Sequence, residues 1–393
     1  MTTTLPATLV LAALIGLAEQ QPSPQTPDEL RARGLELSFN LDHAEALAVI
    51  QEAIAADPAS LAGYRVRATI LWSSTLIEQG AITAEDFTGE SSSPFRSRRS
   101  NAALEQARSD LQRRTDALAA QQRGAARPDV DAIYQVGAAY RFQSGVAGTI
   151  DGSQWHGIVA ARRAYLEHQR VLALDPARKD AALTVGMYRF LVSRLPAWSR
   201  LAARVVGFDS DAASGVRLIE DTAANDGPAQ ASAMFSLIAV YNQLGRYEDA
   251  VRVIGDLQRR FPRNRLLWLE AATTELRAGR PADARLSLER GLHLVAMESR
   301  PLGFGELARW RYQYGVSLAR LRHADAAAQF RAALQAAGFE WVHGRAHLEL
   351  GKLAMRSGQA VEATNEFRTA LRMCDATDDT ICVTESKAFL RSK

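Results

Sequence analysis

Two histidines four residues apart have the spacing best suited to metal chemistry in this sequence of 393 residues. On a helix, His343 and His347 would share one face, where two imidazoles could bind zinc if Glu340 or Glu349 supplied a further ligand. His347 also occupies a position of a repeated pattern where an earlier copy has Trp268, which indicates a packed side chain. We therefore expect a structural histidine here, with no metal and no cofactor.

Catalytic motifs are scarce in the rest of the sequence. It has no Walker loop, no G-x-S-x-G elbow and no carboxylate pair with an evident partner. The glycine-rich run at 303–308 echoes a dinucleotide fingerprint, but no strand pattern precedes it, which indicates a turn. We expect a protein that is not an enzyme; a catalytic site in an insert at 80–96 or 143–157 is the least favoured alternative.

The only two cysteines, Cys374 and Cys382, flank the turn-rich stretch DATDDT. In an oxidising compartment a disulfide between them would join the last regular helix to a capping helix and add about 2–3 kcal/mol of stability there. Two reduced thiols in a cytosolic protein are the alternative. A haem or zinc-ribbon site would need a C-x-x-C spacing, which the sequence lacks.

The first residues have the pattern of a signal peptide. Residues 5–18, LPATLVLAALIGLA, are uncharged and apolar, short for a membrane span and suitable for a signal-peptide core, and Gly16 and Ala18 offer a cleavage site. No Lys or Arg precedes this run, so a short anchor or a buried helix is the alternative. We expect a periplasmic or secreted protein without a transmembrane segment, and a cytoplasmic protein as the second hypothesis.

The composition is that of an ordinary folded protein. Hydrophobic residues make up 47% of the chain, and 47 basic residues nearly balance 44 acidic ones, for a net charge of +3. This balance argues against a surface that binds nucleic acid.

A pattern with a period of 34 residues organises the C-terminal half. Gly245 recurs as Gly279 and Ala250 recurs as Ala284. This period predicts helix–turn–helix units that bury their apolar faces only by stacking on one another. Small residues at the crossings would let paired helices approach closely.

The last copy of the pattern is the clearest one. Its key positions are Leu350, Gly351, Ala354, Gly358, Ala363, Phe367 and Ala370. With these residues the chain resembles tetratricopeptide repeat (TPR) proteins, strongly over 231–374, fairly over 28–58 and loosely between. The resemblance implies an all-α solenoid, a right-handed superhelix of antiparallel helix pairs, with an irregular middle and a C-terminal capping helix. It also implies a concave groove, lined by the first helix of each pair, that holds a peptide or helix of another protein.

Seven segments follow along the chain. We expect a signal peptide at 1–18, a polar linker at 19–27, a TPR-like unit with an extra helix at 28–79, a loop insertion and a long polar helix at 80–128, an irregular helical region at 129–227 with a surface insertion near 143–157, a regular array at 228–374 and a capping helix at 375–393.

The resemblance places a set of mostly basic residues on the groove wall: Gln243, Arg277, Arg309, Arg320, Arg345, Lys352 and Arg356. Arginines in such a row would attract an acidic segment or a C-terminal carboxylate of a partner. The helix macrodipole also favours arginine near a helix C-terminus without any ligand, and this is the simpler explanation.

Aromatic residues and arginines are mixed in the run at 186–208, which Pro196 divides. Such mixing is typical of helices that lie on a membrane surface, and peripheral membrane contact is one hypothesis. Packed repeat helices with exposed arginines are the simpler prediction, because Pro196 would interrupt a continuous amphipathic surface. Taken together, the sequence predicts a non-catalytic scaffold that binds another protein, in the cell envelope; a cytosolic TPR regulatory scaffold is the alternative.

Overall fold

The computed structural model describes residues 25–88, 99–205 and 207–391. Every regular element in these residues is a helix. Within the same ranges, no helix combines the length and the apolar character that crossing a bilayer requires. The apolar run at 5–18 lies outside the described residues.

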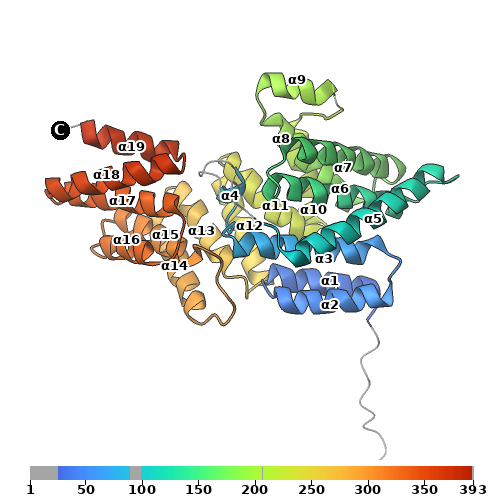
Figure 1. Cartoon of the computed structure of the whole chain (residues 1–393), viewed down its shortest axis with the longest axis horizontal. Helices are drawn as coiled ribbons and strands as arrows, with labels where there is room; N and C mark the ends of the chain where they lie inside the picture. Colours follow the sequence, from blue (N-terminus) through green and yellow to red (C-terminus); the bar gives the residue numbers. More distant parts are fainter. Residues whose placement is uncertain (1–24, 89–98, 206, 392–393) are drawn as a thin grey trace, which may run out of the picture.

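Most helices pack as antiparallel pairs of chain neighbours (Figure 1). The pairs are α1 (Pro27–Phe39) with α2 (His43–Ala56), α3 (Leu61–Glu78) with α5 (Ala102–Gly124), α6 (Val130–Thr149) with α7 (Gln154–Leu174), α8 (Lys179–Ser193) with α10 (Ala212–Ala224), α11 (Gln230–Gln243) with α12 (Tyr247–Arg260), α13 (Leu266–Arg277) with α14 (Pro281–Ala296), α15 (Glu306–Arg320) with α16 (Ala326–Gln335), and α17 (Glu340–Arg356) with α18 (Ala360–Ala376). Each pair stacks on the next, and α19 (Thr380–Arg391) caps α18. The predicted all-α, TPR-like solenoid is confirmed.

Small residues set the spacing within the pairs, as the repeat pattern predicts. A Cβ atom added at Gly315 would lie 2.6 Å from the ring of Phe330, and one added at Gly351 would lie 2.6 Å from the ring of Phe367. Both aromatic rings are buried at these crossings. Each glycine therefore makes room for the aromatic side chain of the second helix in its pair.

The extra residues near 143–157 take a form that differs from the expected surface insert. They lengthen α6 to 20 residues and α7 to 21 residues, and only residues 150–153 link the two helices. A Cβ at Gly145 would lie 2.5 Å from the indole of Trp72, and Gly157 is buried. The glycines in this run thus allow close helix packing.

The run at 186–208 also differs from the expected pair of packed helices. Pro196 follows the end of α8, and the next helix, α9 (Ala197–Val205), leaves the stack (Figure 1). Proline interrupts helical hydrogen bonding, so the chain can change direction at this point. The prediction of packed repeat helices is therefore wrong for α9.

The N-terminal turn between α1 and α2 binds the C-terminal array. The side-chain amide of Asn264 donates to the carbonyl of Phe39 at 2.8 Å. Arg300 donates to the carbonyl of Asn40 at 2.6 Å and to the carboxylate of Asp42 at 2.7 Å. These contacts join residues more than 220 positions apart in the chain.

Apolar side chains complete this closure. Leu41 and Ile82, from the N-terminal units, are buried in one cluster with Leu266, Leu269 and Trp310 of the array. Burying such side chains stabilises the contact by about 1.5–3 kcal/mol each. The N-terminal units are thus part of the core of the C-terminal array.

Candidate binding groove

A short segment of the chain packs against the first helices of the C-terminal pairs, α13, α15 and α17, and against α11; we call the side formed by these first helices the concave face. Residues 77–88, which we call the inner segment, include the end of α3 and the short helix α4 (Glu85–Thr88). The backbone N–H of Phe304 donates to the carbonyl of Glu78 at 2.8 Å. The N–H of Ala84 donates to the carboxylate of Glu270 at 2.7 Å. Main-chain bonds therefore hold the inner segment along the array.

Asp86 and Arg309 form a buried ion pair at the centre of this contact. The two side chains are 2% and 1% exposed, and Arg309 Nη1 lies 2.6 Å from Asp86 Oδ2. The same carboxylate accepts the backbone N–H groups of Ile82 and Thr83, at 2.9 and 3.0 Å. Arg309 Nη2 donates to the Thr83 hydroxyl at 2.7 Å. Both charges therefore have several polar partners, which a buried pair requires.

Glu85 meets three of the arginines that the sequence places on the groove wall. Its carboxylate lies 3.6 Å from Arg277, 3.8 Å from Arg309 and 3.8 Å from Arg345. Arg345 also binds Asp379 through two nitrogens, at 2.5 and 3.2 Å. These three arginines thus contact acidic residues of their own chain, and their binding to a partner stays a prediction.

Two further residues of the predicted set are engaged elsewhere. Arg320 donates to the carbonyl of Leu276, at the end of α13. Lys352 pairs with Glu349 at 2.8 Å and with Glu385 at 2.6 Å, which attaches α17 to α19. Both are therefore structural contacts between neighbouring elements.

The remaining two predicted groove residues lie apart from the inner segment. Arg356 is exposed at the end of α17. Gln243, at the end of α11, lines a separate cleft that is described below. The structure therefore does not gather the seven predicted residues into one site.

Glu270 is a buried carboxylic acid of the groove with a strongly perturbed pKa. Burial raises its pKa to about 7, with smaller contributions from the charges of Asp86 and Glu85. The N–H of Ala84 and the charge of Arg277 act in the opposite direction. Near neutral pH this carboxyl group is therefore partly protonated beside the inner segment.

The histidines of α17 have separate partners. His343 Nε2 lies 3.1 Å from the carbonyl of Ala336, and His347 Nδ1 lies 2.6 Å from Glu366. Glu349 pairs with a lysine. Among the described residues, no group of possible metal ligands includes either histidine. Their roles in this structure are those of packed, hydrogen-bonded side chains.

Cys374 and Cys382 are joined by a disulfide that connects α18 to α19. Together with Asp379 they bring possible ligand atoms within 4.8 Å of one another. Both sulfur atoms are used in the disulfide, and Asp379 binds Arg345. This cluster therefore fixes the capping helix and offers no set of free ligands.

The middle of the solenoid has a cleft that the inner segment does not fill. This open cleft has a volume of about 390 Å³ and lies among α3, α6, α8 and α11. These are the first helices of their pairs, so the cleft continues the concave face toward the N-terminal half. It is lined by Thr69, Trp72, Arg141, Phe142, Ser144, Gly145, Thr184, Met187, Tyr188, Phe190, Leu191, Ser236, Ala239, Val240 and Gln243.

Aromatic and aliphatic side chains form most of the cleft surface. Phe142 is buried at its floor, and Trp72 packs edge-on against it with ring centres 5.9 Å apart. The indole N–H of Trp72 donates to the Thr149 hydroxyl at 2.9 Å, which fixes the ring. Leu191, at the end of α8, is 45% exposed. The cleft therefore offers a preformed apolar surface, which is typical of binding sites.

Polar groups border this apolar surface. The Tyr188 hydroxyl, whose pKa burial raises, is one of them, and it interacts with the hydroxyl of Ser144. Arg141 is exposed at the cleft, and no ion pair among the described residues involves it. Of these cleft residues, only Gln243 belongs to the set predicted from the sequence. Most of the others lie on α3, α6 and α8, where the repeat pattern is irregular, and they were therefore not predicted.

Comparisons with known proteins give likenesses only among solved structures. No family model and no curated protein matches the chain. A Pseudomonas aeruginosa pilF structure is 15% identical, with a TM-score of 0.42, over 67% of this chain and 97% of that one. A tetratricopeptide repeat protein from Parabacteroides merdae is 14% identical, with a TM-score of 0.32, over 79% and 93%. Yeast Tom70 is 10% identical, with a TM-score of 0.41, over 93% and 89%.

At these TM-scores, the likenesses indicate neither an activity nor a partner for this protein. The class of protein follows from the molecule itself, in which paired helices, glycine–aromatic crossings and stacked units define a TPR-like α-solenoid.

Proposed function

We propose that this protein is a non-catalytic scaffold that binds an apolar segment of another protein in the open cleft. The observation that carries the proposal is the contrast along the concave face. The inner segment covers α13, α15, α17 and one side of α11, whereas the cleft among α3, α6, α8 and the other residues of α11 is open and apolar. In a TPR-like solenoid the concave face is the surface on which a partner would be expected.

The cleft chemistry indicates the class of partner segment. A volume of about 390 Å³ suits one or two large apolar side chains between Trp72 and Met187. Arg141 at the cleft favours an acidic residue next to them. Such a segment could bind as a helix or in an extended form, with its apolar residues on one side.

We propose further that the protein works in the cell envelope. The apolar run at 5–18 supports export, and the disulfide between Cys374 and Cys382 suits an oxidising compartment. Intact-mass measurement of the native protein, before and after reduction, tests both points. A retained run at 5–18 together with two titratable thiols would favour the cytosolic scaffold instead.

Photo-crosslinking in the native cell tests the cleft. A photoreactive amino acid at Leu191 or at Gln243 should crosslink to one partner and to the same segment of it. The matched control is Leu286, which is 63% exposed on α14, the second helix of its pair. The control position should give no such product.

A substitution in the cleft then tests whether the crosslinked segment binds there or only lies nearby. Met187→Glu would place a charge against the apolar wall and should lower the affinity for the crosslinked segment at least tenfold. Calorimetry with the corresponding synthetic peptide measures this change. Equal crosslinking from Leu286, or unchanged affinity in Met187→Glu, would rule out the cleft as the binding site.

A further inference from the structure

The helix α9 stands outside the stack. Figure 1 shows it projecting from the body beyond α7 and α8. Its packing on the core involves Ala203, which belongs to a cluster with Tyr165 and Phe208. A helix of a globular protein normally buries its apolar side, so the direction of the apolar side of α9 is informative.

That apolar side faces away from the molecule. Trp198, Leu201 and Val205 are 76%, 66% and 83% exposed. At about 100° per residue, these three side chains fall within an arc of roughly 60° on the helix. Ala203, which packs on the core, lies roughly 170° from the middle of that arc. The most apolar side of α9 is therefore directed outward.

The same segment is positively charged. Residues 191–208 contain Arg194, Arg200 and Arg204 and no acidic residue. Among the described residues, none of these three arginines takes part in an ion pair, in contrast to the arginines that hold the inner segment. Two of them therefore carry unneutralised charge on α9 itself.

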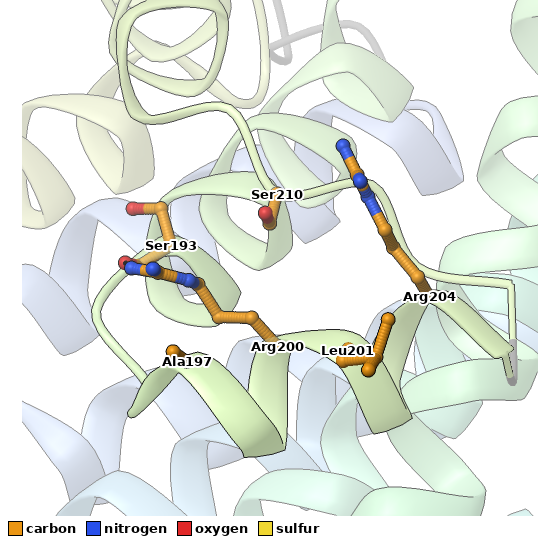
Figure 2. A pocket seen from close by; sticks show the side chains of 6 residues that line it. All are labelled: Ser193, Ala197, Arg200, Leu201, Arg204 and Ser210. Carbon is orange, nitrogen blue, oxygen red and sulfur yellow. Dashed lines mark hydrogen bonds between the residues drawn. The ribbon is translucent and has the colours of Figure 1, made fainter.

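Two of the arginines border a pocket of about 430 Å³ beside the apolar side. Figure 2 shows Arg200 reaching from α9 toward Ser193, Arg204 one turn further along the helix, and Ser210 across the pocket. Arg200 Nη1 donates to the carbonyl of Ser193 at 3.3 Å. Guanidinium and hydroxyl groups in this arrangement suit a phosphate group.

We infer that α9 docks the protein on an anionic lipid bilayer. Trp198, Leu201 and Val205 would enter the boundary between headgroups and acyl chains, while Arg200 and Arg204 would bind lipid phosphate groups. A short helix with an apolar side that includes tryptophan and a flank of arginines has the composition of an interfacial helix. The outward, ridge-like position of α9 gives it access to a flat surface. This surface is separate from the cleft of the proposed function.

The test uses the full chain and lipid vesicles. Binding to phosphatidylcholine vesicles, with and without about 25% phosphatidylglycerol, is measured by co-sedimentation. We expect stronger binding to the anionic vesicles and a loss of this preference in about 0.5 M salt. Arg200→Gln and Arg204→Gln should each weaken binding to anionic vesicles about fivefold.

Variants of the apolar side separate α9 from the N-terminal apolar run. Leu201→Glu and Val205→Glu should lower vesicle affinity at least tenfold while leaving circular dichroism and the melting temperature unchanged, because both side chains are exposed. The matched control is Val361→Glu, at a residue 77% exposed on α18, which should bind as the wild type does.

Trp198 gives a direct readout of insertion. Brominated lipid should quench part of the tryptophan fluorescence of the wild type, and that part should be missing in Trp198→Phe. Unquenched Trp198, or wild-type affinity in Leu201→Glu, would overturn the inference. A dimer that Leu201→Glu dissociates, without any vesicle binding, would show instead that α9 joins two copies of the chain.

Discussion

The C-terminal and middle parts of the concave face are built from the same kind of helix but differ in what covers them. Along α13, α15 and α17, charged side chains such as Arg309 are buried and bind acidic residues of the inner segment. Along α3, α6, α8 and α11, the surface is mostly apolar, and the cleft is open. A buried charge needs a permanent partner, whereas an apolar surface tolerates contact with water.

This difference shows how part of a binding groove can be filled by the protein's own chain and become part of its hydrophobic core. The arginines have the charge that an acidic ligand would need, but the chain supplies that ligand itself through Asp86 and Glu85. A partner that used the same arginines would have to displace the inner segment. The open cleft has no such competitor among the described residues.

The largest expected effect comes from breaking the buried ion pair of Arg309 and Asp86, in the part of the concave face that the inner segment covers. Arg309→Met leaves Asp86 as an uncompensated buried charge and should lower the free energy of unfolding by about 3–5 kcal/mol. Urea denaturation measures this loss. The double variant with Asp86→Asn should lose less than the sum of the two single variants. Additive losses would show that the pair is not coupled, and exposed Arg356→Met serves as the control.

A second test measures how the free energy of unfolding depends on pH, through Glu270 in the same covered part. Burial raises the pKa of Glu270 from 4.5 to about 7, so between these values the folded state binds more protons than the unfolded state. Stability should therefore fall as pH rises from about 5 to 8, by roughly 3 kcal/mol at most. Glu270→Gln should remove this fall, because the amide oxygen can still accept the N–H of Ala84.

The difference between wild type and Glu270→Gln is the quantity to measure. His43 and His168 have pKa values that burial lowers to about 4. They bind fewer protons in the folded state between pH 4 and 6.5, so their contribution to stability rises with pH in that window. Because this contribution is the same in both proteins, it cancels when the stability of Glu270→Gln is subtracted from that of the wild type. Identical pH profiles for the two proteins would contradict the assignment to Glu270.

The disulfide gives a third, smaller effect. Replacing Cys374 and Cys382 by serine should lower the stability of the C-terminal end by about 2–3 kcal/mol, because it removes a short cross-link. Since Asp379 lies between the cysteines and binds Arg345, hydrogen exchange should speed up in α19 and then in the inner segment. Exchange in α6 and α8 should stay unchanged. Faster exchange in those helices would show that the two parts of the concave face are coupled.

The smallest expected change in stability comes from a substitution in the open cleft. Leu191→Ala should change the free energy of unfolding by no more than about 0.5 kcal/mol, because the side chain is 45% exposed. Thermal denaturation measures this. A loss well above 1 kcal/mol would indicate that another part of the protein covers the cleft and that the contrast between the two parts is smaller than we infer.

The sequence predicted the architecture because its signals are local. Glycines at a 34-residue period and the glycine–aromatic crossings, such as Gly351 with Phe367, depend on residues within one helix pair. Of the predicted groove residues, Arg277, Arg309 and Arg345 do contact the inner segment, and their role in binding a partner stays a prediction. Their internal partner was not found, since Asp86 and Arg309 are 223 positions apart and no local pattern connects them.

The open cleft was missed for a different reason, and the simpler prediction for the run at 186–208, packed repeat helices, was wrong for α9. The longer α6 and α7 shift the repeat register, so Trp72 and Tyr188 could not be assigned to a common face from spacing alone. In the run at 186–208, the interruption at Pro196 was predicted, and α8 ends before this residue. It could not show that the chain would leave the stack after Pro196.

The contacts between the first turn and the array have a consequence for how the molecule forms. A repeat array usually folds through neighbouring units, and its ends can be shortened with little effect on the rest. Here Arg300 binds Asn40 across 260 positions, so the concave face closes only after most of the chain has been synthesised. Until then Asp86 and Ile82 lack the surface that covers them. The N-terminal units and the array around 263–310 therefore depend on each other, because both contribute side chains to one hydrophobic cluster.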